Sequence, residues 1–216
     1  MRNAFNAQLD EMHRLLIHMG ELCETVIDNT YQALMKEDRE SAAEIIEKDG
    51  EIEGICLKLL LRQQPVASDL RRVSSALKMI TDMERIGDQA ADIAEIIKTG
   101  NLKAPAEALG MGKMAKATMK MVRDSIDSFV KDDLDLAKQV IDADDEVDGQ
   151  FEQIRHMLAD GLVNKSATQE QVLDLLMIAK YYERIGDHAT NIAEWVVYSI
   201  TGVHKSAELT ERKEQE

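Results

Sequence analysis

Apolar residues recur at intervals of three and four along almost the whole chain, and no run of alternating β-branched residues interrupts this spacing. Such one-sided spacing is typical of amphipathic helices. It predicts an all-α protein with helices near residues 4–36, 39–62, 67–98, 106–130, 133–160 and 168–200. Only two prolines occur in 216 residues, so few positions force a break within helices of this length.

Turn and capping residues mark the predicted helix ends. Ser41-Ala-Ala-Glu44 can act as a capping box in the first turn of the second helix, and Thr168-Gln-Glu-Gln171 can open the sixth helix in the same way. Pro65 separates the second helix from the third, while Gly100 and Pro105 bracket the connection between the third and fourth.

A twelve-residue segment occurs twice in the chain. Residues 84–95 read ERIGDQAADIAE and residues 183–194 read ERIGDHATNIAE, with nine of twelve positions identical. Residues 49–53 match residues 144–148 at a shift of 95 instead of 99, and the four extra residues fit the loop at 164–167. Because a gap in a loop leaves both helix patterns intact, the chain is predicted to contain two copies of one three-helix unit. We expect tandem three-helix bundles at 1–102 and 103–204, followed by a charged tail at 205–216 that is predicted to be disordered.

The repeated segment places acidic residues four positions apart, so that they share one face of a helix. The acidic face comprises Glu84, Asp88, Asp92 and Glu95 in the third helix, Glu183, Asp187, Asn191 and Glu194 in the sixth, and the pairs Asp49 with Glu53 and Asp144 with Asp148. The opposite sides of the two repeated helices are apolar, with Ile86, Ala90, Ile93 and Ile97 in the third and Ile185, Ala189, Ile192 and Val196 in the sixth. Each helix can therefore bury one side and present carboxylates on the other.

This acidic face has two interpretations. Like charges four residues apart cost roughly 0.2–0.5 kcal/mol per pair, and a mid-helix glycine such as Gly87 or Gly186 costs about 1 kcal/mol relative to alanine. A bound cation would offset the repulsion, and carboxylates from two neighbouring helices suit Mg²⁺, Mn²⁺, Ca²⁺ or Fe³⁺. A zinc site built from Cys and His is disfavoured because the second unit has no Cys and no helix has His at ligand spacing. The alternative is a solvated face whose carboxylates pair with Arg85 and Arg184.

The charge balance excludes some classes of partner. Twenty-six basic and 41 acidic residues give a formal charge of −15, which opposes general affinity for nucleic acid or for an anionic membrane and favours cations or a basic protein. Cys23 and Cys56 lie within helical patterns and are interpreted as reduced core thiols. No segment approaches the ~20 apolar residues of a membrane span, and residues 1–20 lack a signal-peptide pattern. We therefore expect a cytoplasmic protein.

The residue patterns also disfavour an enzyme. His188, whose counterpart is Gln89, lies five residues after Glu183 and so breaks the Glu-x-x-His spacing of di-iron bundles. A metal-dependent phosphohydrolase would need a nucleophile, a His cluster or a phosphate-cradling loop, and none is evident. A structural helical adaptor without a bound metal is the remaining alternative.

The segments at 84–88 and 183–194 resemble the PhoU family, the phosphate-specific transport accessory proteins of bacteria. The resemblance extends through PVASDLR at 65–71 and through WVVY at 195–198, followed by Gly202. It implies a protein without enzymatic activity that regulates phosphate uptake and represses the phosphate-starvation response. The implied partners are the ATPase subunit of the phosphate ABC transporter, a sensor histidine kinase and a second copy of the chain in a homodimer. Such contacts would hold a cytoplasmic protein at the inner face of the membrane.

The resemblance further implies metal clusters, with iron or zinc in some members and magnesium or manganese in others, on motifs of the form Glu/Asp-x-x-x-Asp. Carried over by position, the ligands are Glu84, Asp88, Asp92, Glu183 and Asp187, supported by Asp49, Glu53, Asp144 and Asp148. The sequence departs from a symmetric pattern at Asn191, where the first unit has Asp92, and at Tyr181, where it has Asp82. We therefore expect the second site to hold fewer or weaker ions.

Overall fold

The structure, a computed structural model, describes residues 2–46, 54, 70–100, 102 and 109–203. Its helices are α1 (Arg2–Lys36), α3 (Leu70–Thr99), α4 (Met111–Lys131), α5 (Leu134–Val163) and α6 (Gln169–Thr201). Residues 39–46 are also helical and begin the second helix of the chain. No strand occurs among the described residues, and the predicted all-α class is confirmed. The rest of the predicted second helix, with Asp49, Glu53 and Cys56, and the tail at 205–216 lie outside the described residues.

The two predicted capping boxes have different outcomes. Thr168 caps α6 as predicted, since its hydroxyl accepts from the backbone N–H of Gln171 at 3.2 Å and the Gln171 side chain accepts from the backbone N–H of Thr168 at 3.0 Å. At the second helix the cap is Asp38, whose carboxylate accepts from the backbone N–H groups of Glu40 and Ser41 at 3.1 Å each. The helix begins before Ser41, so Ser41 already lies in its first turn and donates its hydroxyl to Asp38 at 2.7 Å.

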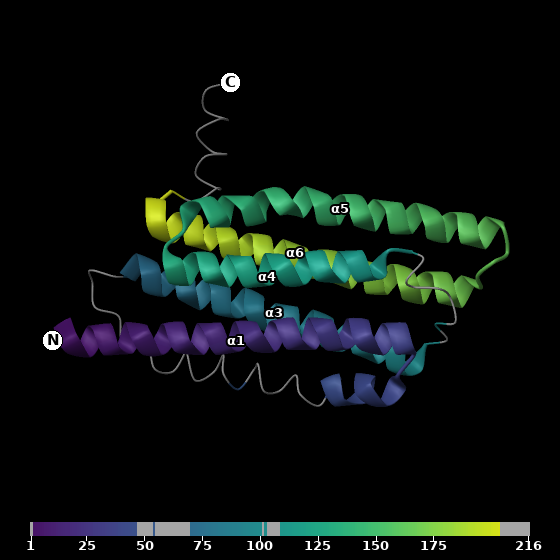
Figure 1. The fold of residues 1–216 in the computed structure, drawn as a ribbon, viewed down its shortest axis with the longest axis horizontal. Helices are drawn as coiled ribbons and strands as arrows, with labels where there is room; N and C mark the ends of the chain where they lie inside the picture. Colours follow the sequence, from purple (N-terminus) through teal and green to yellow (C-terminus); the bar gives the residue numbers. More distant parts are fainter. Residues whose placement is uncertain (1, 47–53, 55–69, 101, 103–108, 204–216) are drawn as a thin grey trace, which may run out of the picture.

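The two repeat units lie side by side (Figure 1). The central helix is α6, which packs against α3, α4 and α5, while α1 lies along α3 and α4. Because α3 and α6 are the repeated helices, the two units meet along corresponding elements. Apolar side chains from all five of these helices belong to one buried cluster. The two copies therefore share a continuous core across their contact.

The apolar sides predicted for α3 and α6 form part of this core. Their eight residues are at most 2% exposed, namely Ile86, Ala90, Ile93, Ile97, Ile185, Ala189, Ile192 and Val196. Burying an aliphatic side chain contributes roughly 1.5–3 kcal/mol relative to leaving it in water, so these stripes determine which side of each helix faces inward. Cys23 is a buried thiol, as predicted, and it donates to the backbone carbonyl of Met83 at 3.5 Å.

Polar and glycine contacts also join the first unit to the second. The hydroxyls of Tyr182 on α6 and Thr30 on α1 lie 3.0 Å apart and are buried, and this burial raises the pKa of Tyr182. On α1, a Cβ added to Gly20 would lie 2.5 Å from Cδ1 of Ile126 on α4. Glycine at position 20 thus permits the close approach of α1 and α4.

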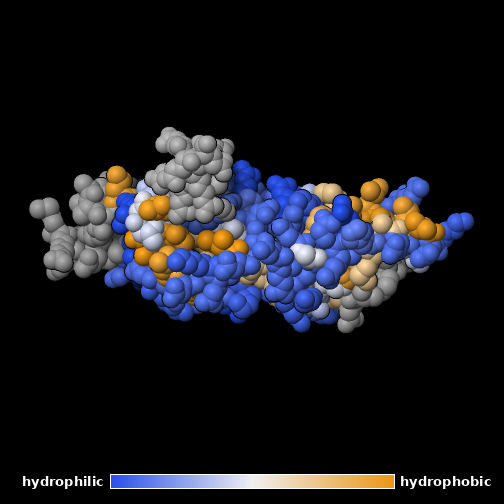
Figure 2. Space-filling view, turned by 90° about the horizontal axis from the view of Figure 1, so that it is seen from above, coloured by the Kyte–Doolittle hydropathy of each residue, from blue (hydrophilic) through white to orange (hydrophobic). Residues whose placement is uncertain are grey.

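The surface is mostly hydrophilic in the view from above, and apolar side chains gather both toward the end at which α5 connects to α6 and toward the opposite end (Figure 2). In the described part of the chain, no helix combines the length and apolarity that crossing a membrane would require.

Candidate metal centre

Four predicted ligands in the second unit influence one another across two helices. Asp144 and Asp148 lie on α5, and Glu183 and Asp187 lie on α6. Partial burial raises the pKa of the Asp187 carboxyl, and the charges of Glu183, Asp144 and Asp148 add to the increase, while Lys180 opposes it. The structure therefore brings these acidic side chains to one side of the α5–α6 pair, where they repel one another. We call them the α5–α6 carboxylates.

The pKa of Asp144 shows the same repulsion from the α5 side. Burial raises it first, and the charge of Asp148 then adds to the increase, while the nearby hydroxyl of Thr190 on α6 lowers it. Because both helices carry like charges here, a cation between them would relieve an existing electrostatic cost.

Gly186 lies beside these carboxylates on α6. A Cβ added there would lie 3.4 Å from Cγ1 of Val147 and 3.8 Å from Oδ1 of Asp144. A Cβ at Gly186 would thus make ordinary van der Waals contacts with α5, and Asp144 lies close to the backbone of α6 at this level.

A lysine already neutralises part of this charge. Lys180, one turn before Glu183 on α6, forms an ion pair with the Glu183 carboxylate. Its ammonium also lies 5.3 Å from the ring centroid of Phe151 on α5, within cation–π range. Among the described residues, no three His, Cys, Asp or Glu side chains form a group arranged to hold a metal ion. A metal at the α5–α6 carboxylates would therefore require these side chains to turn toward a common point.

Only half of the corresponding site in the first unit can be described. Glu84 and Asp88 lie on α3, while Asp49 and Glu53 lie outside the described residues. Arg85 donates to the Asp88 carboxylate at 2.9 Å and lies 4.0 Å from that of Glu84. The ion pairing predicted by the solvated-face interpretation is therefore present on α3.

Two other candidates, Asp92 and Asn191, lie at the contact between the units. Asp92 on α3 accepts a hydrogen bond from the hydroxyl of Tyr181 on α6, and burial raises the pKa of both groups. Asn191 on α6 donates to Oδ1 of Asp82 on α3 at 3.2 Å, and Nδ1 of His188 donates to the same oxygen at 2.9 Å. We call these groups the α3–α6 polar contacts. They give Asp92 and Asn191 a structural role between helices.

Comparison with known proteins identifies the family. The model of the PhoU domain matches the chain twice, at residues 16–97 and 111–196, so that one match falls in each repeat unit. The chain belongs to the PhoU family. The prediction from the repeated ERIGD segments is thereby confirmed.

Relatives match over nearly their whole lengths. The phosphate-specific transport system accessory protein PhoU homolog of Clostridium acetobutylicum is 38% identical over 93% of this chain and 96% of the relative. The accessory protein PhoU of Escherichia coli is 31% identical over 92% and 86%, respectively.

Solved structures show the same fold. The crystal structure of PhoU from Pseudomonas aeruginosa superposes with a TM-score of 0.81 at 32% identity, covering 92% of this chain and all of that one. The phosphate transport system regulatory protein PhoU from Streptococcus pneumoniae gives a TM-score of 0.83 at 27% identity, over 93% and 98%. These relatives are named as accessory or regulatory proteins.

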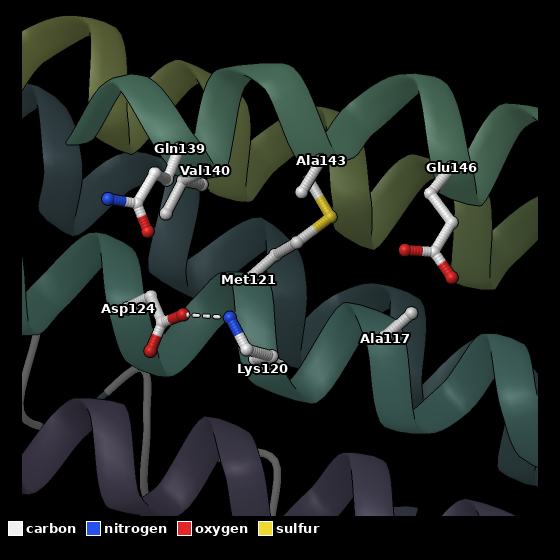
Figure 3. Close-up of a pocket in the computed structure, with 8 residues that line it drawn as sticks. All are labelled: Ala117, Lys120, Met121, Asp124, Gln139, Val140, Ala143 and Glu146. Atoms are coloured by element: carbon white, nitrogen blue, oxygen red, sulfur yellow. Dashed lines mark hydrogen bonds and ion pairs between the residues drawn. The ribbon is translucent and has the colours of Figure 1, made fainter. Parts of the chain in front are cut away.

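A small pocket lies between α4 and α5 (Figure 3). None of the α5–α6 carboxylates lines it. It measures about 130 Å³ and is lined by mixed side chains, including Lys120 and Asp124, which are joined by a hydrogen bond of 2.5 Å, and Glu146. Small-molecule sites commonly span roughly 300–1,000 Å³, so this pocket is below that range.

No functional role was predicted from the sequence for Asp82, Tyr181 or His188. A signal for them existed in the repeat itself, because these positions and their counterparts are where the two units differ within otherwise similar helices. The structure shows that the differing positions face each other across the α3–α6 contact.

Proposed function

We propose that this PhoU-family protein is a metal-binding cytoplasmic regulator of phosphate uptake and of the phosphate-starvation response. The observation that carries the proposal is the match to relatives named phosphate-specific transport accessory proteins over almost their full lengths. It would act by contacting the ATPase subunit of the phosphate ABC transporter and a sensor histidine kinase, and it would assemble as a homodimer. The proposal includes no enzymatic activity.

The α5–α6 carboxylates support the metal-binding part. They offer only oxygen donors from two adjacent helices, a donor set that fits iron, manganese or magnesium and also admits zinc. When bound, the ion would supply positive charge that offsets the mutual repulsion of Asp144 and Asp187. In the first unit, Glu84 and Asp88 would hold an ion together with Asp49 and Glu53. This chain's own contribution is the packing of α5 against α6, which brings Asp144 and Asp148 near Glu183 and Asp187.

Deletion of the gene tests the regulatory part. In phosphate-rich medium, the deletion strain should show higher phosphate uptake or phosphate-regulon expression than the parent, and the wild-type gene should restore the parental level. Unchanged uptake together with unchanged expression would reject the proposal.

Elemental analysis of protein purified without chelators tests the metal site. The Asp144→Asn/Asp187→Asn variant should contain less metal per chain than wild type, because two of the four second-unit carboxylates lose their charge. Asp142→Asn is the matched control, since Asp142 is an exposed carboxylate on the same helix. Equal metal content in the wild type and the double variant would defeat the assignment and favour the metal-free adaptor.

An activity assay tests the exclusion of an enzyme. Metal-loaded protein should leave p-nitrophenyl phosphate unhydrolysed above the rate of a buffer control containing the same metal. Turnover that disappears in Asp144→Asn/Asp187→Asn would instead support a metal-dependent phosphohydrolase.

A further inference from the structure

Exposed apolar side chains gather at the end of the bundle formed by the α5–α6 connection (Figure 2). This apolar tip consists of Met157, Leu162 and Val163 from the end of α5, and Leu173 and Met177 from the start of α6. Their exposed fractions run from 40% for Leu162 to 79% for Val163. Single exposed apolar residues are ordinary on protein surfaces, but a group of them at one place marks an interaction site.

The internal repeat provides a comparison for two of these positions. At the shift of 99 that relates α3 to α6, Leu173 corresponds to Ser74 and Met177 to Lys78. Lys78 is exposed on α3 and Ser74 is half-buried, so α3 packs without an apolar residue at either position. The apolar pair in the second unit thus has no counterpart in the unit that shares its fold.

The spacing of Leu173 and Met177 indicates that a helix could pack against them. Leu173 and Met177 are four residues apart, so they form a short apolar ridge along α6, and Met157 lies near the connected end of α5 in the same hairpin. A third helix can pack against such a pair of helices through apolar residues at spacings of three and four.

The charge around the tip decides between possible occupants. Asp160 in the last turn of α5 and Glu170 in the first turn of α6 are both exposed at this end, and together they outweigh the exposed Lys165 in the connection between the helices. In a symmetric contact between two copies of a chain with a formal charge of −15, these acidic groups would approach their own counterparts. A partner with basic residues beside its apolar face would instead be attracted to them.

We infer that the apolar tip is a docking surface for an amphipathic helix of another protein. The apolar residues of that helix cover Leu173 and Met177, and its Lys or Arg side chains lie near Asp160 and Glu170. The inference does not depend on a bound metal, because the tip contains none of the candidate ligands.

A synthetic helical peptide tests this inference. The probe is an 18-residue fluorescein-labelled peptide with leucines on one face and lysines on its flanks, and its binding to the full chain is followed by fluorescence anisotropy. Leu173→Ser/Met177→Ser should weaken binding at least tenfold, because it removes the ridge without changing the charge. Ile17→Ser is the control, since Ile17 is 38% exposed on α1, away from the tip, and the affinity should remain that of wild type.

Further measurements distinguish a basic helix from an acidic helix and from a second copy of the chain. A peptide with glutamate at every lysine position should bind at least tenfold more weakly than the basic peptide, and the basic peptide should bind equally with EDTA or with Mn²⁺ present. Undiminished binding by Leu173→Ser/Met177→Ser, or equal affinity for the acidic peptide, would overturn the inference. A wild-type dimer in sedimentation velocity that becomes a monomer in the same double variant would also overturn it, because a second copy would then be the occupant.

Discussion

The two α3–α6 polar contacts use different side chains at positions that the internal repeat relates to one another. In one contact, Asp82 accepts from His188 and Asn191, and the side chains of Asp82 and His188 are less than 20% exposed. In the other contact, Asp92 accepts from Tyr181. Both contacts join a carboxylate on the first unit to neutral or basic donors on the second.

The difference shows why the repeats are not identical here. An aspartate at position 191, copied from Asp92, would place a second carboxylate beside Asp82, and an aspartate at position 181, copied from Asp82, would do the same beside Asp92. Two carboxylates at hydrogen-bond distance repel strongly when partly buried. Tyr181 and Asn191 therefore have a structural explanation in the contact between units, independent of how many ions the second site holds.

Among changes to the α3–α6 polar contacts, Asn191→Asp should lower the stability of the protein most. The new carboxylate would lie about where the Asn191 amide now donates to Asp82, replacing a hydrogen bond by a repulsion and lowering the free energy of unfolding by about 1–3 kcal/mol. Urea unfolding at neutral pH measures the loss. The repulsion raises the pKa of one carboxyl in the folded state above its unfolded value, so the deficit should shrink as the pH falls through that raised pKa. A variant as stable as wild type at neutral pH would contradict this account of the asymmetry.

Removing one partner from each contact should show which of the two contacts contributes more to stability. Asp82→Ala leaves two donors without an acceptor and should cost about 1–2 kcal/mol, whereas Tyr181→Phe removes one donor and should cost about 0.5–1.5 kcal/mol. Thermal denaturation can rank them, since 1 kcal/mol shifts the melting temperature by roughly 2–4 °C in a chain of this size. If Tyr181→Phe proves the more damaging change, the two contacts differ in a way that donor number does not explain.

The smallest predicted effect is a stabilisation. Asp187→Asn in metal-free protein removes the like-charge pair with Glu183 and should raise the free energy of unfolding by roughly 0.2–0.5 kcal/mol at neutral pH. Because the folded-state pKa of Asp187 is raised, wild type gains stability as the pH falls through it, and the advantage of the variant should disappear toward the unfolded pKa of about 4. Chemical unfolding across this pH range is the measurement. An advantage that grows as the pH falls would have the wrong sign.

Much of the fold followed from the sequence. The buried sides of α3 and α6 were predictable because a helix with one apolar stripe has only one side to bury, as Ile86 and Ile185 show. The capping box at Thr168 was predictable because all its atoms lie within four residues. The predicted helix began at residue 39, as in the structure, but the cap at Asp38 was missed because Ser41-Ala-Ala-Glu44 also fits the capping-box pattern, and the pattern does not show which side-chain oxygen reaches the free N–H groups.

The candidate site was predictable only along each helix. Spacing alone placed Glu183 and Asp187 on one face of α6, and the repeat supplied Asp144 and Asp148 as further candidates. It could not show that burial and mutual repulsion act on these groups together, because that depends on how α5 packs against α6.

The sequence by itself determined the helices, their apolar sides, the duplication and the family, since all of these are local periodicities or matches along the chain. Tertiary structure decided which acidic residues face solvent or one another and which face the other unit. Asp88 and Asp92 are one helical turn apart, yet the first pairs with Arg85 on its own helix and the second with Tyr181 on α6. Only the packing of α3 against α6 separates the two, because a carboxylate's neighbours depend on contacts between residues far apart in the chain.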